Sequence, residues 1–350
     1  MLSRPWRAIG VLTLVLAALA VAFQGLRVAL HSLDEPLHVT AALRYVIVPG
    51  ASFAHVAADL GRLGVVAEPR TWALFARWKG LASAVKAGEY EISPGMSARG
   101  LLARMVKGEV FLHSFTIVDG WRVSELLAAL RQNTDVAVTL PQAPHGLMQL
   151  LGLGDIDAEG QFLPETYKFP LGTTDAGLLQ MAHAAMLREL ETDWAGRDPN
   201  LPLRDPYALL TLASIVEKES ALPRELRLIA GLYEHRLAIG MRLQADPTII
   251  YGLGDRYTGE LHTVDLRTDG PYNTYTRAGL PPTPIALPSA AALRASAKPE
   301  ITDAIFFVAS DHGDGSHVFS ATLAQQNAAV AKYVAGRNLH PHGPAQGQPH

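Results

Sequence analysis

One glutamate stands where a helix would normally bury an apolar side chain. Residues 205–219 are predicted to be helical, because the initial Asp-Pro supplies a side-chain cap and a proline suited to the first turn. At about 100° per residue, Glu217 lies within about 40° of Leu210 and Ala213 on the apolar face. A separate polar arc holds Thr211, Ser214 and Lys218. The pattern predicts a carboxyl group among apolar neighbours.

A buried carboxyl group holds its proton tightly, since burial disfavours the anion. A neutral Glu217 could therefore protonate a leaving oxygen near neutral pH, as cleavage of a glycosidic bond requires. Glu219 lies about 200° further round the helix, so the two glutamates cannot act as a pair on one bond. A structural ion pair between Glu217 and Arg224 or Arg227 is the alternative interpretation.

Several segments outside this helix could form the walls of a site. Residues 159–167 combine carboxylates with two aromatic rings, and such faces suit sugar rings. Residues 243–252 have polar side chains within an apolar run, and residues 272–275 read Tyr-Asn-Thr-Tyr. The prolines of residues 279–285 fix the backbone at low entropic cost, as loops that present a site often do.

A hairpin is predicted near the C-terminus, with strands at 305–309 and 317–320 and a closing helix from Thr322 to about Val334. Its turn gathers four side chains of types that bind metals, Asp311, His312, Asp314 and His317. Asp and Gly are also the common residues of hairpin turns, and no second ligand set stands at metal spacing. We therefore predict neither a metal nor another cofactor.

The N-terminus carries a candidate membrane anchor. Residues 8–26 contain no charge and follow two arginines in residues 1–7, which predicts a cytoplasmic stub and a single transmembrane helix. A cleaved signal peptide is the alternative, because Ala20-Val21-Ala22 has the small-x-small form of a cleavage site. Both interpretations place the remaining chain outside the cytoplasm.

The exported part is predicted to be α+β with two domains. Residues 27–44 form a connector, residues 45–120 a small β-α-α-β domain followed by a further helix and strand, and residues 121–335 a larger mixed domain before a flexible tail at 336–350. The small domain resembles the LysM-type carbohydrate-binding module, which implies glycan binding. A domain that only positions its neighbour is the alternative.

Composition excludes several classes of protein. With 49% hydrophobic and 18% charged residues in 350, the chain can bury real cores and is not disordered. A net charge of −3 without a basic block argues against a nucleic-acid partner. The absence of cysteine excludes disulfides, thiolate metal sites and cysteine nucleophiles.

Six segments in this order resemble the MltG (YceG-like) endolytic murein transglycosylases. They are the Glu-Gly-Gln-Phe-Leu-Pro-Glu-Thr-Tyr of 159–167, the Leu-Ala-Ser-Ile-Val-Glu-Lys-Glu of 212–219, the Leu-Gln-Ala-Asp-Pro-Thr-Ile-Ile-Tyr of 243–251, the Tyr-Asn-Thr-Tyr of 272–275, the Gly-Leu-Pro-Pro-Thr-Pro-Ile of 279–285 and the Gly-Ser-His-Val-Phe of 315–319. The resemblance covers about residues 45–335.

The resemblance implies cleavage of the β-1,4 bond between N-acetylmuramic acid and N-acetylglucosamine in nascent peptidoglycan, leaving a 1,6-anhydro end. Glu217 matches the family's catalytic glutamate and would act as acid and then base. The residues expected to bind substrate are Glu165, Tyr167, Gln244, Tyr272, Asn273, Tyr275 and His317. The family also implies a periplasmic catalytic domain on the inner membrane, with penicillin-binding synthases as partners and no cofactor.

Four positions depart from the family pattern. Ala245 stands where Ser or Thr is frequent, Glu165 replaces an Asp, and Leu287 and Ser289 replace an Asn and a Gly. We expect these changes to alter substrate contacts and to leave the acid unaffected.

Two other functions are compatible with the same residues. A hydrolytic muramidase would need a second carboxylate, for which Asp246 or Glu165 is the candidate. A catalytically silent glycan-binding scaffold would need no acid at all.

Overall fold

The computed structural model describes residues 4–142, 146–220 and 222–339. The chain divides into two compact units, one of Met1–His113 with Lys168–Leu171 and one of Ser114–Tyr167 with Gly172–His350. Helices and two-stranded sheets make up the fold. The predicted α+β class is therefore confirmed.

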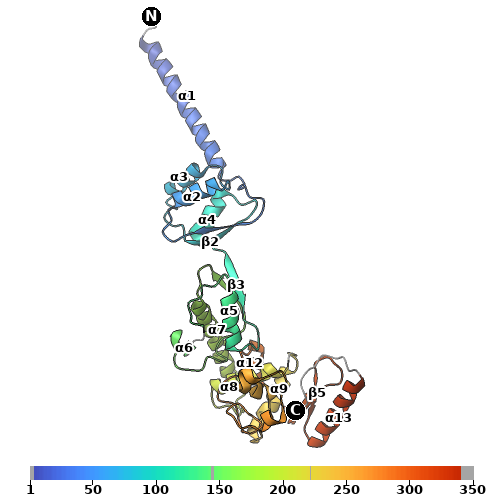
Figure 1. Ribbon diagram of the computed structural model, residues 1–350. Coiled ribbons are helices and arrows are strands. Elements are labelled where there is room, and N and C mark those ends of the chain that lie inside the picture. The colour runs from blue at the N-terminus through green and yellow to red at the C-terminus, as the bar shows by residue number, and fades with distance from the viewer. Residues whose placement is uncertain (1–3, 143–145, 221, 340–350) are drawn as a thin grey trace. The chain divides into compact units, whose positions relative to one another are not determined.

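The first unit begins with a long apolar helix, α1 (Arg4–His31), which extends past both ends of the predicted anchor. Residues 12–31 have a mean hydropathy of 1.9 over 20 residues, and none of this stretch is buried within the protein. Its length matches a hydrocarbon core of about 30 Å. Figure 1 shows α1 as one continuous helix that leads into the rest of the unit. It is compatible with a single-pass membrane anchor.

The rest of the first unit follows the predicted β-α-α-β order. The elements are β1 (Leu43–Ile47), α2 (Phe53–Arg62), α3 (Pro69–Trp78), β2 (Gly88–Ile92) and α4 (Ala98–Lys107). Strands β1 and β2 pair antiparallel. Ser52 caps α2 and Ser97 caps α4 through side-chain oxygens that accept backbone N–H groups, as their sequence positions predict. The apolar faces of the helices enclose Trp72, which is fully buried.

Most of the remaining elements belong to the second unit. They are β3 (Leu112–Thr116), α5 (Val123–Gln132), α6 (Leu147–Leu150), β4 (Thr166–Pro170), α7 (Asp175–Ala195), α8 (Pro206–Glu219), α9 (Leu226–Ala238), α10 (Asp246–Leu253), a 3-10 turn (Gly254–Arg256), α11 (Thr263–Arg267), α12 (Ala290–Ala297), β5 (Phe306–Ala309), β6 (His317–Ser320) and α13 (Leu323–Leu339). β5 and β6 form the predicted hairpin, with Ala309 opposite His317.

Helix α8 lies in the middle of the second unit's core, and α7, α9 and α12 pack against it (Figure 1). Every side chain from Leu209 to Val216 is buried. Thr211 and Ser214 of the predicted polar arc are therefore buried and do not face solvent. The Ser214 hydroxyl donates to the Thr211 carbonyl at 2.7 Å and accepts the Ile285 N–H at 3.0 Å, so burial leaves its polar atoms satisfied.

Candidate active site

Glu217 lies in the last turn of α8 and is half-buried. Its Oε2 accepts two hydrogen bonds from Ser289, one from the hydroxyl at 2.6 Å and one from the backbone N–H at 3.0 Å. Burial raises the pKa of Glu217 above its usual value, and the two bonds from Ser289 oppose that rise. The acid is thus held in a defined orientation while keeping a raised proton affinity.

The alternative ion pair is not formed. Arg224 pairs instead with Asp314 at 3.2 Å, and the Nε of Arg227 donates to the Lys298 carbonyl at 2.8 Å. Glu219 takes a different direction from Glu217, because its Oε1 accepts from the Tyr233 hydroxyl of α9 at 2.5 Å. The two glutamates therefore do not converge, as the helix phase predicted.

Ser289 is also the N-cap of α12, where its Oγ accepts the Ala292 N–H at 3.1 Å. The Oγ atom of Ser289 thus accepts one hydrogen bond, from Ala292, and donates its own hydrogen to Glu217 Oε2. Oε2 already receives two hydrogens, and no hydrogen bond within the described residues reaches Oε1. We infer that neutral Glu217 carries its proton on Oε1. The departure at Ser289 therefore bears on the environment of the acid as well as on substrate contacts, because this side chain touches the carboxylate.

The backbone from Asp119 to Trp121 forms a second wall beside Glu217. The Gly120 N–H donates to the Leu287 carbonyl at 2.9 Å, and the Leu287 N–H donates to the Trp121 carbonyl at 2.7 Å. Gly120 has φ +72, and a Cβ there would lie 3.7 Å from Glu217 Cγ. The loop is therefore fixed against the acid.

Asp119 is a site residue that the sequence analysis missed. Its negative charge raises the pKa of Glu217, although burial and Ser289 have larger effects. Partial burial also raises the pKa of Asp119 itself above its usual value. The sequence feature that could have identified Asp119 is an Asp-Gly pair directly after a predicted strand. The same pair is common in ordinary turns, so it does not by itself indicate a site.

Glu159 is a second buried acid that the sequence analysis quoted without assigning a role. It accepts the Val123 N–H at 3.0 Å and the Tyr251 hydroxyl at 3.2 Å. Burial raises its pKa to about 7 despite these two bonds. The next residue, Gly160, has φ +81 and lies so close to Pro284 that a Cβ would approach its ring atoms at 2.6 Å. Residues 159–160 therefore lie against the proline-rich loop.

The start of α10 and the 272–275 loop form one hydrogen-bonded cluster. The Gln244 N–H donates to the Thr274 carbonyl at 3.1 Å, and the Tyr275 hydroxyl donates to Asp246 at 2.7 Å. Gln244 has φ +51, a left-handed conformation that non-glycine residues adopt rarely and that often marks functional sites. The fold thus brings together Gln244, Tyr275 and Asp246.

Two members of the 272–275 loop are engaged in shaping it. The Asn273 side-chain amide donates to the carbonyls of residues 265, 266 and 268, and its oxygen accepts the Tyr275 N–H at 2.9 Å. Tyr272 shares a 2.8 Å hydrogen bond with the Thr283 hydroxyl, and its ring contacts Tyr251 edge-on. These contacts join the loop to the proline-rich segment.

The three other predicted site residues have different environments. Glu165 is exposed and its carbonyl accepts the Ile117 N–H, whereas the buried Tyr167 donates to the Leu163 carbonyl at 2.7 Å. The Nδ1 of His317 lies 2.7 Å from Glu225 Oε2. Its ring is therefore oriented by a carboxylate.

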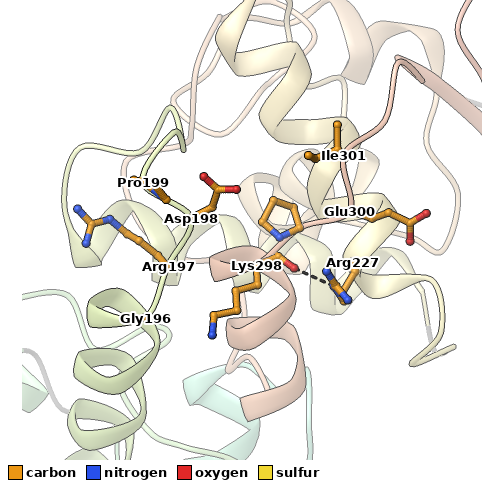
Figure 2. A pocket seen from close by; sticks show the side chains of 9 residues that line it. Gly196, Arg197, Asp198, Pro199, Arg227, Lys298, Glu300 and Ile301 are labelled. Atoms are coloured by element: carbon orange, nitrogen blue, oxygen red, sulfur yellow. Dashed lines mark hydrogen bonds between the residues drawn. The ribbon is translucent and has the colours of Figure 1, made fainter.

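No group of three or more His, Cys, Asp or Glu side chains within the described residues could hold a metal ion. A pocket of about 630 Å³ lies at another place in the second unit, and the residues that line it include Arg197, Arg227 and Lys298 (Figure 2). Arg227 bonds the Lys298 carbonyl there, and Arg197 bonds the Trp194 carbonyl at 2.7 Å. These cations satisfy carbonyls at the ends of α7 and α12, as side chains near helix C-termini commonly do.

The fold and Glu217 together define a candidate acid/base site carried by a buried helix. A family model described as the YceG-like family matches residues 45–332. The chain therefore belongs to the YceG-like family.

Curated relatives carry an enzyme name. A Bacillus subtilis protein named endolytic murein transglycosylase is 27% identical over 314 residues, which cover 83% of this chain and 85% of that protein. A Streptococcus pneumoniae protein of the same name is 28% identical over 343 residues, covering 87% of this chain and 61% of the relative. A crystallised YceG-like protein from Listeria monocytogenes aligns with a TM-score of 0.49 and 24% identity, over 83% of this chain and 99% of that one.

Proposed function

We propose that this chain is a membrane-anchored endolytic murein transglycosylase that uses Glu217 as its general acid and base. Supporting this proposal are the names of the relatives and, above all, the half-buried Glu217 carboxyl held by Ser289. Its substrate is the β-1,4 bond between N-acetylmuramic acid and N-acetylglucosamine within peptidoglycan strands. Cleavage inside growing strands would terminate their elongation.

The reaction proceeds without added water. Glu217 Oε1 gives its proton to the glycosidic oxygen as the bond from C1 of the muramic residue to that oxygen breaks. The C6 hydroxyl oxygen of the same residue then bonds to C1, and its proton passes to the Glu217 carboxylate. The products are a 1,6-anhydro end and a free N-acetylglucosamine hydroxyl, and the acid regains its starting protonation state.

Ser289 assists the step in which Glu217 is an anion. Its two hydrogen bonds to Oε2 stabilise the carboxylate that forms when the proton leaves. The negative charge of Asp119 acts in the opposite sense and favours proton retention before the reaction. Together with burial, which has the largest effect, they set the pH range in which Glu217 is a competent donor.

The predicted substrate-binding residues have distinct proposed roles. Gln244, Tyr275, Glu165 and His317 contact the glycan, whereas Asn273, Tyr272 and Tyr167 shape the surrounding loops through the hydrogen bonds they already make. The first unit is proposed to be LysM-like and to bind glycan. Helix α1 is proposed to anchor the chain in the inner membrane with both units in the periplasm, beside penicillin-binding synthases.

The decisive experiment compares wild type, Glu217→Gln and Glu191→Gln, the last being an exposed glutamate of α7 that serves as the matched control. Full-length protein in detergent is incubated with purified peptidoglycan, and the products are analysed by mass spectrometry. Wild type and Glu191→Gln should release anhydro ends, each lighter by one water than a reducing end, and Glu217→Gln should release none. Reducing ends would support a hydrolytic muramidase, and glycan binding without products would support a scaffold.

A further inference from the structure

Helix α3 exposes a face that combines basic, aliphatic and aromatic side chains. This face consists of Arg70, Leu74, Arg77 and Trp78, which share one side of the helix by their spacing. Leu74 is 67% exposed and Trp78 is 73% exposed, although both are large and apolar. The opposite side buries Trp72, Phe75 and Ala76 in the core of the first unit. The helix thus covers its core and still presents an apolar surface outward.

Helix α3 lies beside the C-terminal end of α1. The Arg99 guanidinium lies 4.4 Å from the Phe75 ring, and its Nη2 donates to the Leu30 carbonyl of α1 at 3.5 Å. The Trp78 ring is 6.5 Å from that of Phe75. Leu30 is about 6 Å along the helix from Leu26, the last residue of the uncharged run, and a headgroup layer is about 5–8 Å thick. An α1 that spans a bilayer with its uncharged residues 8–26 in the hydrocarbon core therefore places α3 at headgroup depth.

The charge of the α3 face matches an anionic lipid surface. Residues 69–78 contain two arginines and no acidic residue, and Lys79 places its Nζ 4.5 Å from the Trp78 ring. The adjacent acid on this helix is Glu68 at the N-cap. Leu74 and Arg77 also line a groove of about 610 Å³, which gives a headgroup room to enter. Tryptophan and basic residues are the side chains enriched at membrane surfaces.

We propose that the α3 face, with Lys79, docks on the anionic phospholipid surface of the membrane that α1 crosses. This inference rests on the membrane anchoring in the proposed function. Two attachments, one by α1 and one by α3, fix the orientation of the first unit relative to the bilayer. The partner is thus a phospholipid bilayer bearing anionic headgroups.

The absence of cysteine makes a direct depth measurement practical. A nitroxide is attached to Leu74→Cys, and the matched control is Val46→Cys, an apolar position of β1 that is 45% exposed and pairs with Glu89. Full chain is reconstituted in phosphatidylcholine vesicles with and without phosphatidylglycerol. Collision rates with oxygen, which concentrates in lipid, and with a water-soluble nickel chelate are then measured.

With phosphatidylglycerol present, the ratio of oxygen to nickel collisions should be higher at position 74 than at position 46. Combining Arg70→Gln, Arg77→Gln and Lys79→Gln should lower the ratio at 74 towards that of the control, as should removing phosphatidylglycerol. Equal, water-like ratios at both positions would overturn the proposal, and so would poor access of both reagents to 74, which indicates packing against protein.

Flotation of the same vesicles separates this inference from the anchor. If the protein floats with the vesicles but the label at position 74 has water-like collision rates, the docking proposal alone is overturned. Chain that does not float overturns the anchor and the docking together. Anhydro products released by the same samples report the enzymatic proposal independently.

Discussion

Ser289 and Glu217 are 72 residues apart in sequence, yet the hydroxyl of the first lies 2.6 Å from the carboxylate of the second. The same serine caps α12, so the acid is tied to the beginning of a helix through one side chain. This contact links the proton affinity of Glu217 to the N-terminus of a neighbouring element.

Ser289→Gly should raise the pKa of Glu217, because it removes a hydrogen bond that stabilises the carboxylate and keeps the backbone N–H bond. A hydrogen bond to a charged group contributes about 1.5–3 kcal/mol, which corresponds to an upward shift of about one to two pH units. Since the protonated acid is the donor, the alkaline limb of kcat/KM moves to higher pH. The profile is measured by anhydro-product release, and glycine is a tolerable N-cap.

Ser289→Thr keeps the hydroxyl and serves as the conservative control. Its alkaline limb should stay near that of wild type. If the glycine variant has the wild-type limb, Ser289 does not tune the acid.

Asp119→Asn should move the alkaline limb of the kcat/KM profile to lower pH. Removing the negative charge lowers the pKa of Glu217, so the acid loses its proton at lower pH and activity declines earlier as pH rises. Added salt should shrink the difference from wild type, because it screens the charge of the exposed Asp119. Asp303→Asn, an exposed position in the same unit, is the charge-matched control. An alkaline limb that moves to higher pH in Asp119→Asn would contradict the assigned effect of Asp119 on the pKa of Glu217.

Glu159 should make the second unit less stable as pH rises. Its pKa is about 7 in the folded chain against an ordinary 4.5, so the native state binds the extra proton between these values. The stabilisation that depends on this proton is fully present below about pH 4.5. Up to about 3 kcal/mol of the free energy of unfolding is lost as pH rises from there through 7. Urea unfolding at pH 5 and pH 8 measures the difference.

Glu159→Gln should lessen that pH dependence, because the amide remains neutral and can still accept the Val123 N–H. Glu165→Gln, in the same segment but exposed, is the comparison for unfolding and should retain the wild-type dependence. An identical pH dependence in wild type and Glu159→Gln would refute the assignment.

Gly160→Ala should destabilise the chain by about 1–3 kcal/mol, since the new Cβ would meet Pro284 at 2.6 Å. Gly172→Ala is a matched control, because Gly172 has a similar φ of +88 but open space where a Cβ would go. The control therefore measures only the cost of a left-handed alanine. If the unfolding midpoint falls equally in Gly160→Ala and Gly172→Ala, the close packing of Gly160 against Pro284 contributes nothing to stability.

The sequence by itself determined the local features of this protein. The period of apolar residues predicted α2, α4 and α8, serine and proline placed their starts, and the phase of α8 separated Glu217 from Glu219. The hairpin of β5 and β6 followed from its strands and turn residues. These features depend on neighbours a few residues away, which is why a linear pattern contains them.

Only the tertiary structure decided which groups surround the acid. The charge of Asp119 acts on Glu217 from the loop that follows β3, and Ser289 bonds it from the start of α12, so neither interaction has a periodic signature. The buried polar side of α8 was missed for the same reason, since Ser214 is satisfied by Ile285, 71 residues away. A side chain's proton affinity depends on the charges, donors and burial that the whole fold assembles around it.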